Sequence, residues 1–224
     1  MGGDEAFEFG IIESAGPDLL LGALVTLRIT LGAFLLALGL GLPLGVARQR
    51  SALARRLSGP YVEVFRGTPL LIQLFFLYYG LPSVGVTMPA DMAAYVGLGL
   101  NGAAYLCEIV RGSLDGVPHG QEEASRATGL SPGQSLLYVL LPQAMRTALP
   151  PVVNAYASML KESSLVSVLA ITELTRVGQL VYTRTFRPFE IYLAVGALYF
   201  VLTWMATFLA RRLEARFGAI SCRA

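Results

Sequence analysis

The amino-acid sequence predicts an all-α integral membrane protein with about five transmembrane helices. Its 224 residues are 54% hydrophobic and only 14% charged, with a mean hydropathy of +0.60. Soluble domains carry roughly 25% charged residues. The apolar residues also gather in runs that approach the roughly 20 residues a helix needs to cross a bilayer core. Composition and run length therefore place the chain among membrane proteins before any motif is considered.

Five apolar segments are candidates for these helices. The first is apolar except for Arg28, and the fourth contains Lys161 and Glu162. The central parts of the second and third carry no charge, and the fifth is uncharged throughout. The predicted spans are 19–47, 63–86, 91–111, 147–172 and 191–210.

Arginine placement predicts that the N-terminus lies outside and the C-terminus inside, because cytoplasmic loops carry an excess of Lys and Arg. Residues 1–18 hold five acidic residues and no Lys or Arg, so we expect an external acidic segment there. A single membrane domain then covers 19–216, with a cytoplasmic tail at 217–224. The arginines that follow the first and fifth spans are Arg48, Arg50, Arg55, Arg56, Arg211, Arg212 and Arg216. The external loop 172–190 also carries three arginines, so it is either a solvated loop or a contact for an external partner.

The cytoplasmic loop 112–146 predicts two short helices joined at a glycine. The first helix covers 121–128, with two acidic residues in the first turn, where the helix dipole favours them. Gly129 suits the end of that helix, and Ser131 with Pro132 suits the start of the next. Residues 127–145 carry no charge, but they contain glycines and prolines and only a short apolar run, which argues against a sixth span.

The same loop carries a spaced motif. Glu123-Ala124-Ser125 is followed by Gly129, and nine residues later by Val139, Leu141 and Pro142. This order resembles the E-A-A, three residues, G, nine residues, I-x-L-P pattern of ABC importer permeases, with Ser125 and Val139 as departures. The resemblance implies that the loop is a coupling helix that docks on an ATPase subunit. The residues it assigns to docking are Glu122, Glu123, Ala124, Ser125, Gly129, Leu130, Ser131 and Pro142.

Three further stretches resemble the polar amino acid permeases of the histidine and glutamine importer type. They are EVFRGTPLLIQLFFLYYGLP from residue 63, YLCEIVRGSLDGVPHGQEEASRATGLS from residue 105, and LPQAMRTALPPVVNAYASMLKESSLVSVLAITEL from residue 141. The resemblance implies the permease subunit of an ATP-driven importer for a polar amino acid in a bacterial inner membrane. It also implies ABC ATPase subunits that hold ATP and Mg²⁺, a second identical or similar permease, and an external substrate-binding protein. No cofactor is expected on this chain.

Polar side chains at similar depth in three predicted spans suggest a translocation path, because such groups usually face a bundle interior or a water-filled route. Helical spacing groups them by face. The candidates are Gln73, Asn101, Tyr105, Glu108, Asn154, Ser158, Lys161, Glu162, Ser163 and Ser164. Lys161 and Glu162 either bind an amino acid or neutralise each other. Arg66, Thr68 and Arg111 lie near the cytoplasmic ends and form either a gate or a structural contact.

Other classes of function find less support. The net charge of +2 comes without a separate basic cluster, which argues against nucleic acid as a partner. One histidine, His119, and two distant cysteines offer no metal-ligand spacing. The sole lysine, Lys161, is not preceded by the glycines of a phosphate-binding loop, so ATP hydrolysis is expected on a separate subunit and not on this chain. The alternative is a secondary amino acid transporter or channel that works without an ATPase partner.

Overall fold

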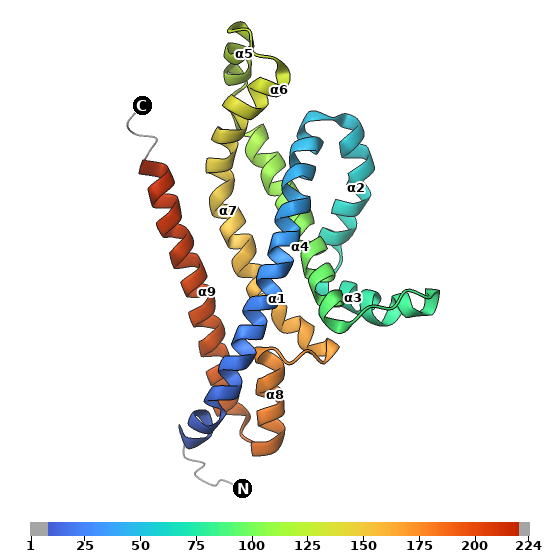
Figure 1. The fold of residues 1–224 in the computed structure, drawn as a ribbon, viewed down its shortest axis with the longest axis vertical. Helices are drawn as coiled ribbons and strands as arrows, with labels where there is room; N and C mark the ends of the chain where they lie inside the picture. Colours follow the sequence, from blue (N-terminus) through green and yellow to red (C-terminus); the bar gives the residue numbers. More distant parts are fainter. Residues whose placement is uncertain (1–8, 220–224) are drawn as a thin grey trace.

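The computed structural model describes residues 9–219, and within that range the regular elements are all helical. Figure 1 shows a long bundle in which four helices run beside one another: α1 (Phe9–Arg50), α4 (Ala90–Asp115), α7 (Leu141–Glu162) and α9 (Pro188–Ala219). Among the described residues, four helices are long and apolar enough to cross a membrane, and a bent pair offers a fifth. The predicted all-α membrane fold is confirmed.

The closest packing in the bundle joins α1 to α4. A Cβ atom at Gly41 would lie 2.7 Å from the carbonyl oxygen of Ala103, and one at Gly45 would lie 2.6 Å from that of Cys107. Ala33 and Ala37 are fully buried on the same side of α1. Small residues of this kind let two helix backbones approach closely inside a membrane, where burial of apolar surface from water does not drive association. We call this contact the α1–α4 seam.

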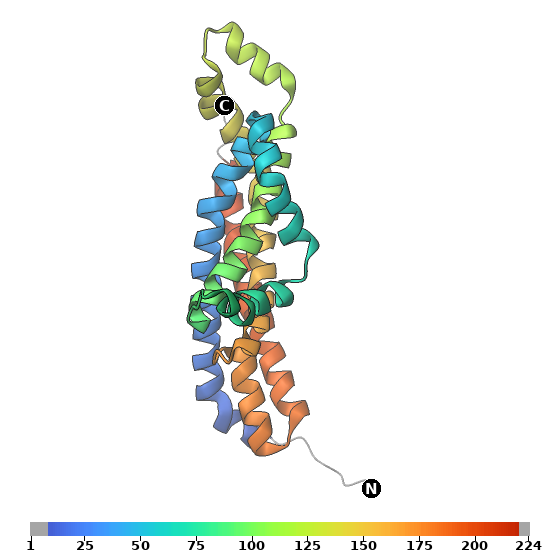
Figure 2. The same cartoon turned by 90° about the vertical axis from the view of Figure 1, so that its right-hand side faces the viewer.

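The second predicted span, 63–86, is not one straight helix. It begins inside α2 (Ala52–Gly67) and then passes through three short elements, α3 (Leu70–Phe75), the π-helix η1 (Phe76–Gly80) and the 3₁₀-helix η2 (Leu81–Val84). The two parts meet at an angle of 108°. Thr68 is extended (φ −112°, ψ 143°) because the residue before a proline avoids helical geometry, and Pro69 follows it. Figures 1 and 2 show that α3 and the short helices after it leave the bundle sideways.

The fourth predicted span, 147–172, begins earlier than expected. After α6 (Pro132–Ser135) the π-helix η3 (Leu136–Leu140) leads directly into α7, and the 3₁₀-helix η4 (Ser163–Leu169) follows. Pro132–Leu169 is one candidate span of 38 residues. The sequence predicted a separate short helix that begins at Ser131. In the structure that helix, α6, continues through the π-helix η3 into α7 and is the start of one long helix. Residues 127–145 do not form a separate crossing.

The loop 172–190, which the arginine distribution predicted to be external, contains an unexpected helix, α8 (Leu174–Thr185). It packs against α1 and α9 at the end of the bundle that holds the N-terminus (Figure 1). Leu19, Leu174 and Ile191 form the centre of this contact and are almost fully buried. α1 starts at Phe9 and not at residue 19, so part of the predicted N-terminal segment is helical. Residues 1–8 of that segment and residues 220–224 of the predicted tail lie outside the described residues.

Candidate functional site

The predicted coupling loop forms a compact turn between α5 (His119–Ala127) and α6, at the opposite end of the molecule from α8 (Figure 1). Gly129 has a φ of +89°, a left-handed conformation that glycine adopts without strain, and the N–H of Leu130 donates to the carbonyl of Ser125 at 3.3 Å. Ser131 then caps α6: its hydroxyl accepts from the N–H of Gln134, whose side chain accepts in return from the N–H of Ser131. The structure therefore has both helix caps that the sequence predicted.

The two faces of α5 have different surroundings. Glu122 and Ser125 face the rest of the chain: Arg50 donates to Glu122 at 2.8 Å, and the Ser125 hydroxyl is hydrogen-bonded to that of Ser135. Glu123 and Ala124 are exposed on the other side. Ser125, which the resemblance assigned to docking, is buried and does not belong to the exposed face of α5. Pro142 stays exposed at the first turn of α7.

A cavity of about 270 Å³ lies between α4 and α7. It brings together polar side chains that the sequence placed on separate spans. The predicted path residues that line it are Asn101, Tyr105, Asn154, Ser158 and Glu162, with Gly102, Ile109, Pro151, Ala155 and Met159 completing the wall. One cavity therefore holds half of the ten predicted path residues, and we call it the α4–α7 cavity.

Lys161 does not reach this cavity. It is exposed on α7, whereas its neighbour Glu162 is half-buried and lines the wall. Asn154, Ser158 and Glu162 follow one another at intervals of four residues, and all three line the cavity. Ser163 is also away from the cavity: it is fully buried and donates to the carbonyl of Leu160 at 2.7 Å. Of the two adjacent charged residues that the sequence offered, Glu162 lines the cavity and Lys161 does not, and Ser164 lies in the 3₁₀-helix η4 that follows.

Gln73 and Asn101 form a clamp across the break between α2 and α3. The Gln73 amide donates to the carbonyls of Phe65 and Thr68 at 2.9 and 3.0 Å, and the Asn101 amide donates to Phe65 at 3.0 Å and to Gln73 at 3.1 Å. Broken helices leave backbone groups without their intrahelical partners, and inside a membrane those groups need other hydrogen bonds. The Thr68 hydroxyl completes the clamp by accepting from Gln73 and donating to Val64. Gln73 thus supports the chain path and does not line the α4–α7 cavity.

Glu108 lies among three arginines toward the C-terminal end of α4. Arg48 and Arg111 reach its carboxylate at 3.1 and 3.0 Å, and Arg66 lies 3.9 Å away. This places Glu108 in an ion-pair cluster and outside the cavity. The same cluster contains two of the residues predicted as gate or structural contacts. Arg66 also lies over the ring of Tyr105, 5.4 Å from its centre, so the cluster borders the cavity.

The sequence analysis missed a buried carboxylate, Glu173, at the N-terminus of α8. It is fully buried and accepts hydrogen bonds from the N–H groups of Thr175 and Arg176 and from the hydroxyls of Thr26 and Tyr199. Burial raises the pKa of the Glu173 carboxyl, while these hydrogen bonds act to lower it. The residue thereby joins α1, α8 and α9. An acidic residue directly before an amphipathic stretch was the signal available in the sequence.

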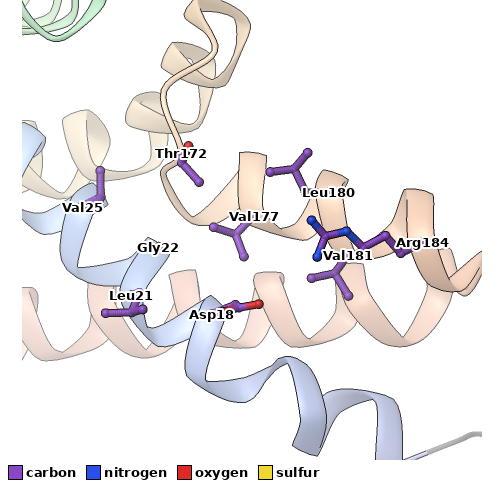
Figure 3. A pocket seen from close by; sticks show the side chains of 9 residues that line it. All are labelled: Asp18, Leu21, Gly22, Val25, Thr172, Val177, Leu180, Val181 and Arg184. Atoms are coloured by element: carbon purple, nitrogen blue, oxygen red, sulfur yellow. The ribbon is translucent and has the colours of Figure 1, made fainter.

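A second cavity, of about 390 Å³, lies between α1 and α8 (Figure 3). Its walls are mostly apolar, from residues such as Val25, Val177 and Leu180, and Asp18 and Arg184 are the charged residues that line it. It is larger than the α4–α7 cavity. However, it contains none of the predicted path residues, and it lies at the end of the bundle with α8. We therefore regard the α4–α7 cavity as the candidate site.

Comparison with known proteins gives consistent matches. Residues 37–219 match the family described as binding-protein-dependent transport system inner membrane component. The glutamine transport system permease protein GlnP of Escherichia coli (strain K12) is 38% identical over 213 residues, covering 94% of this chain and 97% of that protein. The probable amino-acid permease protein YxeN of Bacillus subtilis is 39% identical over 194 residues, covering 85% and 87%. A crystal structure of an amino acid ABC transporter with histidines superposes with a TM-score of 0.88 at 35% identity, covering 94% and 99%.

The fold and the matches together define a multi-pass transport protein of the inner membrane. The chain belongs to the family of inner membrane components of binding-protein-dependent transport systems. The resemblance to ABC importer permeases that rested on the loop motif is therefore confirmed. The roles of individual residues in docking and in the path stay predictions.

Proposed function

We propose that this chain forms the membrane path of an ATP-driven importer for a polar amino acid, and that the α4–α7 cavity holds the amino acid in transit. The observation that carries this proposal is the convergence of Asn101, Asn154 and Glu162 on one cavity of about 270 Å³. That volume lies just below the roughly 300–1,000 Å³ typical of small-molecule sites, which suits a small solute. The names of the relatives, which transport glutamine or other amino acids, support the same substrate class.

The cavity offers partners for each part of an amino acid. The Glu162 carboxylate suits the ammonium group, and the two asparagine amides can both donate and accept hydrogen bonds. Arg66, which lies over Tyr105 at the edge of the cavity, offers a cation for the carboxylate. Lys161, which the sequence offered for that role as one of two alternatives, is exposed and does not line the cavity.

The partners follow from the same proposal. The exposed face of α5, with Glu123 and Ala124, docks on an ABC ATPase subunit that binds ATP and Mg²⁺. A second permease, identical or similar, completes the path, and an external binding protein delivers the amino acid. This chain itself then contributes transport and no ATP hydrolysis, and it requires no cofactor.

The decisive experiment is to reconstitute the chain with its ATPase and binding protein in vesicles and to screen amino acids for stimulated ATP hydrolysis and for uptake. We expect stimulation by one or a few polar amino acids. Glu162→Gln should lower uptake at least about tenfold, since a hydrogen bond to a charged group contributes about 1.5–3 kcal/mol. Glu63→Gln, the same change at an exposed position on α2, is the matched control. Uptake driven by an ion gradient without the ATPase would overturn the proposal in favour of a secondary transporter.

A further inference from the structure

The last turn of α1 carries two arginines that bind different parts of the molecule. Arg48 donates to Glu108 on α4 at 3.1 Å and to the Ser58 hydroxyl on α2 at 2.9 Å. Arg50 donates through one nitrogen to Glu122 on α5 at 2.8 Å and through another to the carbonyl of Pro132 on α6 at 3.1 Å. The end of one helix is therefore attached both to a wall of the α4–α7 cavity and to the coupling loop.

General rules account for arginines at this place but not for their contacts. A cation is favourable in the last turn of a helix, and cytoplasmic loops are rich in arginine. Neither rule requires that Arg50 bridge two helices that lie 72 and 82 residues further along the chain. The side chains of Arg50 and Glu122 are 26% and 29% exposed, so the pair is partly shielded from water. A guanidinium that holds two acceptors in fixed directions orients them, which a single point charge does not.

The contacts of α5 show what Arg50 adds. The Ser125–Ser135 hydrogen bond and the Gln143–Gln121 hydrogen bond, at 3.2 Å, join α5 to α6 and α7, which follow it in the chain. The pair between Arg50 and Glu122 joins α5 to α1. Through that pair, a displacement of α5 reaches α1 as well as α7.

We propose that Arg50 is a positioning residue for coupling, an inference that rests on the proposed function. Arg50 fixes α5 to the end of α1 through Glu122. Arg48 transmits a displacement of that end of α1 to α4 through Glu108. Docked ATPase subunits push on the exposed face of α5. Arg50 passes this movement to the last turn of α1. The Arg48–Glu108 pair, whose side chains are 10% and 19% exposed, passes it to the inner end of the helix that forms one cavity wall.

The test uses the reconstituted complex and measures uptake and ATP hydrolysis in the same vesicles. Arg50→Glu and Glu122→Arg should each lower uptake per ATP hydrolysed about tenfold, as expected when a charge-assisted pair becomes a repulsive one. The double variant with both changes should recover to within about threefold of the parent, since it restores the pair but not the bond to Pro132. A change that merely damaged the fold would lower uptake and ATP hydrolysis together and would not be rescued by the second change.

Two further variants sharpen the result. Arg50→Lys should give an intermediate ratio, because a lysine keeps the charge but cannot hold both acceptors in a fixed fork. Arg56→Glu, the same charge change at an exposed position on α2, should leave the ratio of uptake to ATP hydrolysis unchanged. A normal ratio in Arg50→Glu, or no recovery in the double variant, would overturn the inference.

Failure of the proposed function is distinguishable from failure of this inference. If the parent complex shows no ATP-driven uptake, the proposed function fails, and hydrogen exchange on the purified permease then decides the role of Arg50. We expect Arg50→Gln to raise the exchange rate of the α5 amides, residues His119–Ala127, several-fold, because the helix loses its tie to α1. Unchanged exchange in α5 would show that Arg50 does not position it.

Discussion

The two sides of α4 meet their neighbours in opposite ways. Toward α1, glycines bring the backbones so close that a Cβ atom at Gly45 would lie 2.6 Å from the Cys107 carbonyl oxygen. Toward α7, the same helix presents Asn101 and Tyr105 to a cavity of about 270 Å³. The first side is closely packed and mostly apolar, and the second is hollow and lined by polar side chains.

This difference shows how one membrane helix, α4, both packs against α1 to hold the bundle together and lines the α4–α7 cavity. In a bilayer, close approach of backbones through small residues holds helices together, so the α1–α4 seam fixes the position of α4. Polar groups are costly in lipid and gather on the side that faces the bundle interior. Substitutions on the two sides should therefore affect different measurements: stability for the seam, and transport for the cavity.

The largest effect is expected at the seam. In Gly45→Leu, the new side chain meets the backbone of α4 and cannot be accommodated without separating the helices, so we expect a loss of about 3 kcal/mol in stability, at the upper end for overpacked sites. The midpoint of thermal unfolding in detergent measures it. Gly39→Leu is the matched control on the same helix, because nothing lies within 4 Å of a Cβ there. Equal losses for the two variants would show that the seam does not hold the helices together.

The next effect concerns transport and not stability. Ser158→Leu places an apolar side chain in the α4–α7 cavity, so uptake should fall about tenfold or more while the unfolding midpoint stays near that of the parent. Met145→Leu, a volume-conserving change at an exposed position on the same helix, is the control for both measurements. Normal uptake in Ser158→Leu would place the path elsewhere.

A smaller effect is expected at the clamp, whose member Asn101 also lines the α4–α7 cavity. Gln73→Leu removes the donor to the Phe65 and Thr68 carbonyls, although Asn101 still donates to Phe65. We expect a loss of about 1–2 kcal/mol, with faster hydrogen exchange in Leu70–Val84. Exchange that stays as slow as in the parent would mean that other contacts set the angle between α2 and α3.

The smallest effect is expected at Lys161. Its side chain is exposed and away from the cavity, so Lys161→Ala should change uptake by no more than about twofold. The comparison with Glu162→Gln in the same vesicles is the informative one. If Lys161→Ala causes the larger loss, the substrate is held on the other face of α7.

Much of the architecture was predictable from local signals. The apolar runs gave the order of the membrane helices and, when the bent pair is counted as one span, their number. Gly129, Ser131 and Pro132 gave the turn of the predicted coupling loop, because each of these residues has a strong backbone preference. The polar residues of the cavity were also found, since amides and carboxylates in an apolar run are conspicuous. Lys161 and Glu162 were both candidates, and only the structure shows that Glu162 lines the cavity and Lys161 does not.

Other features depend on contacts that no local pattern records. The charge-free run that contains Pro69 reads as one span, although the chain turns through 108° there. The Phe65 and Thr68 carbonyls at that turn accept from Gln73, and Phe65 accepts in addition from Asn101, which lies 36 residues further along the chain. In the same way, the sequence predicts an arginine at the cytoplasmic end of a membrane helix, which Arg50 satisfies. It does not predict the ion pair of Arg50 with Glu122, which depends on how α1 and α5 are arranged in space.

The length of α1 has a mechanical consequence. Its 42 residues make a helix about 63 Å long, roughly twice the thickness of a bilayer core of about 30 Å. Tilt alone cannot hide such a length, so the helix emerges from the lipid, with Asp18 beside α8 toward one end and Arg50 beside α5 at the other. A partner that binds at one end of α1 and a partner that binds at the other end therefore contact the same helix. A displacement at either end can reach the other end through α1.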